Sequence, residues 1–279
     1  MTSKPAATAK AATESKPAKI SVRGVTKTFA LGRETFTALD DVSLDIADNE
    51  FVTVVGPSGC GKSTLMNILA GLETPTEGQA LVDGEEVRGP GPERGVIFQQ
   101  YALFPWLTVR QNVEFGLRTM GMAKDERRRR AEHFIKLVGL ERFADALPKT
   151  LSGGMRQRCA IARAYAVGPS ILLMDEPFGA LDALTRVKLQ EQLLDTWSQD
   201  KRTVLFITHD VDEAVFLANR VIVMASRPGR IYDVIDVPAV ERDEDFRLSA
   251  EFAQLRNRVW HSVYHQDGAT AARTATRTT

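Results

Sequence analysis

Hydrophobic and polar residues follow two different periods along this chain. From residue 20 to about residue 95 the apolar positions have the pattern of strands, in ISVRGVTKTF, VSLDI, FVTVV and QALVDGEEV, where Asp83-Gly84 signals a turn. Between about residues 105 and 168 the period is helical, in TVRQNVEFGLRTM, KDERRRRAEHFIKLVGL and a longer segment beginning SGGMRQRCAIARAYA. The pattern predicts a strand-rich part followed by a helical subdomain inserted between strands.

Short apolar runs alternate with helical segments in the rest of the chain. ILLMDEP, TVLFITHD and RVIVMAS are separated by TRVKLQEQLLDTWSQ and VDEAVFLAN, an alternation typical of a parallel α/β sheet. Strand-like RIYDVIDV and a helix from about Asp245 to Tyr264 follow. We expect tails without structure at 1–18 and 267–279, one domain at 19–240 with the helical subdomain at about 105–168, and a C-terminal helix within 241–266.

Composition excludes several classes of protein. The 279 residues are 43% hydrophobic, enough for one large domain or two subdomains. Lysine plus arginine and aspartate plus glutamate both number 36, so the basic excess of a nucleic-acid-binding protein is absent. Two cysteines, Cys60 and Cys159, favour a reducing compartment. The first residues lack the apolar core of a secretory signal, and no apolar run approaches the roughly 18 to 20 residues of a membrane helix. Any membrane role is expected to come through a partner.

The segment GPSGCGKST follows the apolar run FVTVV and matches the phosphate-binding pattern GxxxxGK[ST]. Its glycines let backbone N–H groups turn toward phosphate oxygens, while Lys62 supplies a positive charge for the β- and γ-phosphates and Ser63 a hydroxyl for Mg²⁺. A chance match in a chain this long has a probability on the order of one in a hundred. We therefore interpret the segment as a nucleotide site made by Gly56, Pro57, Ser58, Gly59, Cys60, Gly61, Lys62, Ser63 and Thr64.

Two further segments carry groups suited to phosphate chemistry. ILLMDE ends an apolar strand with Asp175, placed to hold Mg²⁺, and Glu176, placed to orient or deprotonate the attacking water. An acidic strand end that caps the next helix is the alternative. LSGGMRQR opens a helix whose free N–H groups would face an anion, although taken alone the segment is better explained as an ordinary serine N-cap with flexible glycines. Its first residues are Ser152, Gly153 and Gly154.

GPSGCGKST, FQQ, LSGGMRQR, ILLMDEP, GALD and ITHD, in this order and spacing, resemble the ATP-binding cassette subunit of ABC transporters over roughly residues 20–240. The resemblance implies an α/β fold of the P-loop NTPase class, with a RecA-like core, an antiparallel β subdomain and an inserted helical subdomain. It also implies an ATPase with ATP and Mg²⁺ as cofactors.

The resemblance assigns roles to the matched residues. Glu176 corresponds to the catalytic base, Gln99 to the glutamine that contacts Mg²⁺ or the water and senses the membrane partner, and His209 to the switch histidine. Phe29 matches an aromatic residue that stacks on adenine, and Phe36 is its rival. The catalytic residues implied are Lys62, Gln99, Glu176 and His209, the Mg²⁺ ligands are Ser63, Gln99 and Asp175, and further nucleotide contacts are Phe29, Ser152, Gly153, Gly154, Gln157 and Asp182.

The family's geometry implies partners. Two cassettes, either two copies or this chain and a paralogue, sandwich two ATP molecules head to tail, so that each site needs Lys62 of one chain and Ser152 of the other. A polytopic permease, a periplasmic or lipid-anchored substrate-binding protein, no nucleic acid, and a peripheral place at the cytoplasmic face of the inner membrane are expected. FPWLTV at 104–109 lies where the family receives the permease, with core packing as the rival explanation.

Other features have simpler explanations. Cys60 could respond to redox conditions, but a small side chain filling the loop is the simpler reading, and Cys159 is expected on a buried helix face. ERRRRAEH at 126–133 is expected to be a solvated helix face rather than a nucleic-acid site. His261 and His265 have helical spacing but no third metal ligand nearby.

GPGPERGVIFQ, LFPWLTV and DEPFGALDALTR look most like the nitrate, sulfonate and taurine importers. The alternative is a soluble ABC ATPase that acts on DNA or ribosomes. Against it, the chain has neither a long coiled-coil insertion nor a second cassette. An exporter cassette and a P-loop kinase or GTPase fit the motifs less well, and the cargo cannot be read from a cassette.

Overall fold

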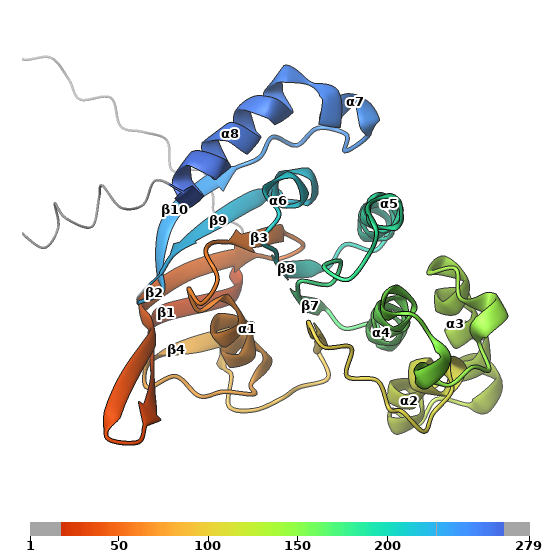
Figure 1. Cartoon of the computed structure of the whole chain (residues 1–279). Coiled ribbons are helices and arrows are strands. Elements are labelled where there is room, and N and C mark those ends of the chain that lie inside the picture. The colour runs from red at the N-terminus through yellow and green to blue at the C-terminus, as the bar shows by residue number, and fades with distance from the viewer. Residues whose placement is uncertain (1–17, 227, 265–279) are drawn as a thin grey trace, which may run out of the picture.

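The computed structural model of the chain describes residues 18–226 and 228–264. Residues 1–17 of the expected N-terminal tail, the whole expected tail at 267–279, and His265 lie outside the described residues, while Ala18 begins a strand. Four strands within residues 18–86 form an antiparallel sheet in the order β2-β1-β4-β5. Its strands are β1 (Ala18–Leu31), β2 (Glu34–Ala47), β4 (Glu77–Val82) and β5 (Glu85–Glu86). The long β1–β2 hairpin projects from the body of the molecule (Figure 1).

A second sheet of six strands has the order β10-β9-β3-β8-β7-β6. Neighbouring strands from β9 to β6 are parallel, and only β10 pairs in the antiparallel sense. The strands are β3 (Phe51–Val55), β6 (Arg94–Ile97), β7 (Ile171–Asp175), β8 (Thr203–Ile207), β9 (Arg220–Ala225) and β10 (Arg230–Asp236). β3 and β7 both pair with β8, which places the carboxyl ends of separate chain segments side by side.

Helices cover both faces of the six-stranded sheet (Figure 1). α1 (Lys62–Ala70) lies between the two sheets, and α5 (Ala183–Gln199), α6 (Val211–Leu217) and α8 (Ala250–Tyr264) cover the opposite face. Alternate residues of one strand enter the two cores: Val52 and Val54 pack with α1, while Phe51 and Val55 pack with the opposite helices. The predicted architecture of an α/β core with an antiparallel subdomain is confirmed.

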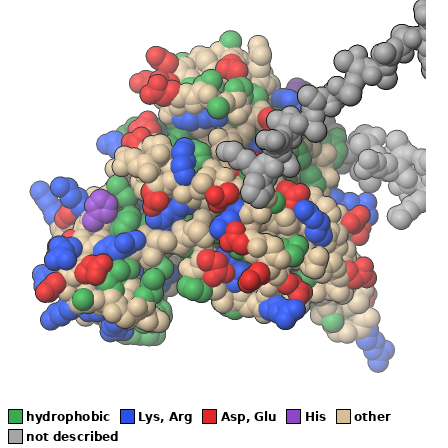
Figure 2. All heavy atoms as spheres, turned by 180° about the vertical axis from the view of Figure 1, so that it is seen from behind, with side chains coloured by type: hydrophobic (Ala, Val, Ile, Leu, Met, Phe, Trp, Pro, Cys, Tyr) green, Lys and Arg blue, Asp and Glu red, His purple; other side chains and the backbone are tan. Residues whose placement is uncertain are grey.

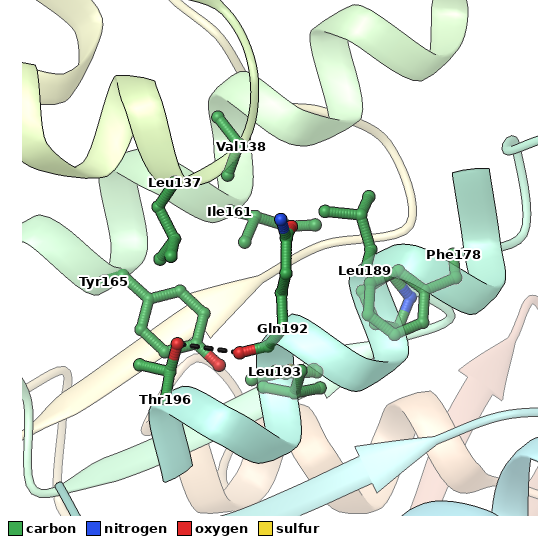
Figure 3. A pocket seen from close by; sticks show the side chains of 11 residues that line it. Leu137, Val138, Ile161, Tyr165, Phe178, Leu189, Gln192, Leu193 and Thr196 are labelled. Carbon is green, nitrogen blue, oxygen red and sulfur yellow. Dashed lines mark hydrogen bonds between the residues drawn. The ribbon is translucent and has the colours of Figure 1, made fainter. Parts of the chain in front are cut away.

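The helical subdomain consists of α2 (Val109–Thr119), α3 (Lys124–Leu137) and α4 (Gly153–Val167), with short 3₁₀ turns at Glu141–Phe143 and Pro148–Thr150. It projects to one side of the sheet (Figure 1). A narrow pocket of about 350 Å³ separates α3 and α4 from α5 (Figure 3). Its lining is mostly apolar, but it includes Tyr165 of α4, a buried residue whose hydroxyl has no hydrogen-bond partner.

The arginine run in α3 is exposed at Arg128 and Arg129, whereas Arg127 and Arg130 are half-buried. Arg127 pairs with Glu114 at 3.2 Å, Arg128 with Glu132 at 3.1 Å, and Arg130 donates to a backbone carbonyl of α4. Acidic and basic side chains mingle over the face of the molecule in Figure 2. Both observations favour the expected solvated face.

The C-terminal part differs from the prediction of one helix from Asp245 to Tyr264. Two helices, α7 (Glu244–Leu248) and α8, meet at Ser249, whose backbone is extended with φ −74° and ψ 155°. The Ser249 hydroxyl accepts a hydrogen bond from Phe252 N at 3.0 Å and so starts α8 as its N-cap. Within the described residues, no helix is long and apolar enough to cross a membrane.

Candidate nucleotide site

The segment after β3 forms a loop that closes around its own lysine. Lys62 Nζ donates to Gly56 O at 2.8 Å and to Pro57 O at 3.1 Å, and the residue is only 8% exposed. The loop turns into α1 at Gly61, whose φ of 92° is a left-handed conformation that favours glycine. The lysine charge is therefore held among backbone groups at the N-terminus of a helix, an arrangement suited to phosphate.

Close backbone packing supports this loop from behind. A Cβ on Gly61 would lie 2.8 Å from Ala38 O, and one on Gly229 would lie 2.2 Å from Cys60 O. Gly229 follows β9 and was not a predicted site residue, although its proline-glycine pair is a turn signal. Cys60 is fully buried, and burial raises the pKa of its thiol, which fits the expected filling role rather than a redox one. Cys159 is also buried, as predicted.

Asp175 ends β7 beside the loop. It is 7% exposed, and burial raises the pKa of its carboxyl, while a hydrogen bond with the Ser63 side chain lowers it. A buried carboxylate next to a hydroxyl is the oxygen donor set that Mg²⁺ prefers. The residues present therefore fit the predicted Mg²⁺ site.

Glu176 is the meeting point of three chain segments. His209 Nδ1 lies 3.0 Å from Glu176 Oε2, and Gln99 Nε2 donates to the same oxygen at 3.4 Å. Glu176 has a φ of 46°, rare for a residue with a side chain, and its N–H donates to Ile207 O of β8 at 2.9 Å. Such a held, unfavourable backbone conformation is typical of functional positions. The ends of β6, β7 and β8 thus bring Gln99, Glu176 and His209 together.

An open cleft of about 830 Å³ connects these groups with two aromatic rings. Phe29 and Phe36 are opposite each other in the β1–β2 hairpin, and both line the cleft. The Lys27 ammonium lies 4.9 Å from the centroid of the Phe29 ring. Both proposed adenine contacts therefore reach the cleft, and the choice between them stays open. The other lining residues are Ala38, Ser58, Gly59, Cys60, Gly61, Lys62, Ser63, Thr64, Gln99 and Glu176.

The predicted contacts from the signature segment lie elsewhere. Ser152 is exposed and caps α4, accepting from Met155 N at 3.3 Å, and none of the residues found to line the cleft comes from 152–157. Gln157 is 1% exposed, with neither side-chain polar atom paired, so its side chain is not presented to a ligand. Asp182 caps α5 by accepting from Thr185 N at 3.0 Å. In a single chain these residues do not complete the cleft.

A polar network behind His209 was missed by sequence reasoning. Arg186 of α5 pairs with Asp210 at 3.3 Å, and Asp210 caps α6 by accepting from Glu213 N at 3.1 Å. With Glu176, Arg186 and Asp210 line a small cleft of about 210 Å³. The cap pattern at 210–213 was readable from the sequence, but the partner on α5 was not.

The segment after Gln99 is held by a buried asparagine. Asn112 of α2 accepts from Phe104 N at 2.9 Å and donates to Leu107 O at 2.9 Å and Thr108 O at 3.0 Å. Trp106 remains 71% exposed, and Phe104 packs on Phe115 with 4.3 Å between ring centroids. The loop thus combines inward packing with one outward aromatic side chain.

Comparisons with known proteins agree with this geometry. A family model described as ABC transporter matches residues 39–179. A putative ATP-binding protein of Brucella abortus (strain 2308) is 71% identical over 84% of this chain and 91% of its own length. The nitrate import ATP-binding protein NrtD of Synechocystis sp. is 51% identical over 76% of this chain and 80% of its own length.

A sulfonate importer subunit and a solved cassette are also similar. The aliphatic sulfonates import ATP-binding protein SsuB of Bacillus thuringiensis subsp. konkukian is 44% identical over 88% of this chain and 96% of its own length. The dimeric structure of a post-hydrolysis state of an ATP-binding cassette bound to ADP and Pi has a TM-score of 0.73 at 38% identity, covering 79% of this chain and 100% of that one.

Proposed function

Because this chain belongs to the ABC transporter family, as an ATP-binding subunit that hydrolyses ATP, we propose that it powers the import of a small anion through a separate permease. Nitrate, an alkanesulfonate or taurine is the proposed cargo class. The likeness to the nitrate and sulfonate import proteins supports this choice, together with the importer-like segments LFPWLTV and GALDALTR. Because the cassette itself does not contact the cargo, specificity lies with its partners.

The proposed mechanism assigns one task to each group in the cleft. Lys62 binds the β- and γ-phosphates, and Glu176 takes a proton from the attacking water. His209 and Gln99 both contact Oε2 of Glu176, at 3.0 and 3.4 Å, and so orient the carboxylate that accepts that proton. Ser63, Asp175 and Gln99 would hold Mg²⁺, which would neutralise charge on the phosphate oxygens. The observation that carries this assignment is the meeting of three strand ends at Glu176.

The proposed assembly has two cassettes, a polytopic permease and a periplasmic or lipid-anchored substrate-binding protein, with the cassettes at the cytoplasmic face of the inner membrane. Exposed Trp106 and the loop held by Asn112 are the surface proposed to meet the permease. The dimer of the similar solved cassette supports pairing of two cassettes. The free N–H groups at Ser152 would then complete the site of the opposite chain.

Co-purification tests this function. We expect tagged Glu176→Gln protein to accumulate ATP-bound dimers and, from detergent-solubilised cells with Mg-ATP, to bring down a polytopic permease and its binding protein. Lys62→Ala, handled identically, is the control for nucleotide dependence. Recovery of ribosomes or DNA without a membrane protein would refute the transporter role. If the captured binding protein bound none of nitrate, alkanesulfonates or taurine in titrations, the proposed cargo class would be wrong.

A further inference from the structure

A chain of hydrogen-bonded polar side chains, two of them buried, leads from α7 to the turn that carries His209. Gln190 of α5 and Glu213 of α6 are 3% and 5% exposed, and Gln190 Nε2 donates to Glu213 Oε1 at 2.9 Å. The other end of the same amide, Gln190 Oε1, accepts from Arg247 Nη2 of α7 at 2.7 Å. Three successive helices, α5, α6 and α7, therefore share one hydrogen-bonded path.

Glu213 belongs to a closed ring of hydrogen bonds around the turn. The Thr208 side chain interacts with the Glu213 carboxyl and lowers its pKa, and Glu213 N donates to Asp210 Oδ1 at 3.1 Å. Asp210 N donates to Thr208 Oγ1 at 3.0 Å and so closes the ring. His209 lies between these two residues and reaches Glu176 from there. The ring therefore fixes the backbone that presents His209 to the Glu176 carboxylate.

Arg247 decides which end of the Gln190 amide faces Glu213. A glutamine amide can present either its oxygen or its NH₂ group to a neighbour, whereas a guanidinium only donates. Arg247 therefore takes the oxygen and leaves the NH₂ group for the carboxylate. The guanidinium carbon of Arg247 lies 3.3 Å from the centroid of the Phe216 ring, which holds it in place. Without Arg247 the amide could turn, and two acceptors would face each other.

We propose that Arg247 is a positioning residue for ATP hydrolysis, which acts through Gln190 and Glu213 on the turn that carries His209. This role rests on the function proposed above for His209 and Glu176. It gives the C-terminal helices a part in the reaction although they lie outside the nucleotide cleft. The contact crosses 57 residues between Gln190 and Arg247, so no local sequence pattern indicates it.

The electrostatics of Glu213 explain why a lost donor matters. Burial raises the pKa of its carboxyl, and the hydrogen bonds from Thr208 and Gln190 oppose that rise. Removal of the Gln190 donor favours the neutral acid, because a buried carboxylate is stable only when it is hydrogen-bonded. The ring around His209 then loses the charged acceptor that holds the Thr208 hydroxyl.

Steady-state ATPase assays on the full chain, at protein concentrations that saturate dimerisation, test this role. Arg242→Ala is the matched control, because Arg242 also anchors the C-terminal segment. It donates to Ala218 O at 3.0 Å and Pro238 O at 2.7 Å and lies 4.6 Å from the Phe246 ring, but it does not contact the ring of hydrogen bonds. We expect Arg247→Ala to lower kcat about tenfold, the smaller of the losses found when a partner that orients a metal ligand is removed, with little change in KM for ATP. Arg242→Ala should leave kcat near the parent value.

Four further variants complete the test. Gln190→Leu should lower kcat like Arg247→Ala, and the double variant should be no worse than either single one, because both remove the same path. Arg247→Lys, which restores a cation near Gln190, should recover part of kcat. Equal kcat for Arg247→Ala and Arg242→Ala, or additive losses in the double variant, would overturn the positioning role while His209→Ala still lost activity. A His209→Ala protein at the parent rate would instead refute the site assignment itself, and the positioning role with it.

Discussion

At the scale of single residues, the nucleotide loop depends on how closely another backbone approaches it. Gly229 donates its N–H to Ala38 O at 3.1 Å, and its Cα lies where a Cβ would be 2.2 Å from Cys60 O and 2.7 Å from Ala38 O. Carbonyl oxygens of the loop and of β2 cannot both move aside without displacing the residues that surround Lys62. Glycine is required here because a Cβ would not fit between these two carbonyl oxygens, not because the backbone has an unusual φ.

Gly229→Ala should therefore weaken nucleotide binding. We expect the dissociation constant for ATP to rise at least about tenfold and the free energy of unfolding to fall by about 1–3 kcal/mol, as overpacking usually costs. Titration with a fluorescent nucleotide and chemical denaturation measure the two effects. Gly89→Ala is the control, because a Cβ there meets nothing within 4 Å. Equal affinity for the two variants would show that the loop does not depend on this contact.

Residue types at fixed spacing predicted which side chains gather at the cleft. Lys62, Asp175 and Glu176 could be named from sequence because phosphate and Mg²⁺ accept few kinds of side chain, and because the ends of parallel strands meet at one edge. Gly229 and Arg247 could not, since each acts through a contact with a distant part of the chain. The sequence also did not show which residues of a motif are exposed: Gln157 lies in the segment LSGGMRQR but is only 1% exposed.

At the scale of elements, periodicity predicted nearly every helix and strand. It failed at the C-terminal helix, which is interrupted so that two aromatic side chains can pack. α7 and α8 were expected as one helix, but the extended residue Ser249 turns the chain between them. The break lets Phe246 and Phe252 both be buried, with their rings edge to face at 5.4 Å. Tertiary packing therefore determines where the helix is interrupted. The sequence does not show the interruption, because the residues on both sides of Ser249 have helical periodicity.

The contact between the helical subdomain and α5 allows an element-scale prediction. Tyr165 and Thr196 line the same pocket, but the Thr196 hydroxyl donates to Gln192 O at 2.7 Å, whereas the Tyr165 hydroxyl is buried without a partner (Figure 3). A buried hydroxyl without a partner destabilises the fold, because it has lost its hydrogen bonds to water and gained none in the protein. Burial also raises the pKa of Tyr165, so it stays neutral.

Tyr165→Phe should leave the free energy of unfolding unchanged or raise it by up to about 1 kcal/mol, because only an unsatisfied group is removed. Thr196→Val is the matched comparison and should be the less stable of the two, since it deletes a hydrogen bond that is made. Urea denaturation of both variants measures the difference. A Tyr165→Phe protein that lost more stability than Thr196→Val would show that the hydroxyl is bonded in solution.

At the scale of the whole molecule, the predicted site residues of one chain lie on two separate surfaces. The cleft contains Lys62 and Glu176, while Ser152, with the free N–H groups of α4, does not line it. In a dimer with twofold symmetry, the surface that a first chain offers to its partner is offered back in return. Two copies arranged head to tail would therefore complete two equal sites, each with Lys62 from one chain and Ser152 from the other.

Mixing two inactive variants tests this arrangement. Lys62→Ala disables the cleft of its own chain, and Ser152→Arg, at an exposed position, blocks the half-site offered to the partner. Each homodimer then has two damaged sites, but a mixed dimer concentrates both lesions in one site and leaves the other intact. We expect the equimolar mixture to regain about a quarter of the parent ATPase rate if pairing is random and sites are independent. Differently tagged chains verify that mixed dimers have formed. If the mixture were then as inactive as its components, either each chain completes its own site or the two sites hydrolyse ATP only when both are intact. Mixing Lys62→Ala with the double variant Lys62→Ala/Ser152→Arg is the control, because no pairing of those chains restores an intact site.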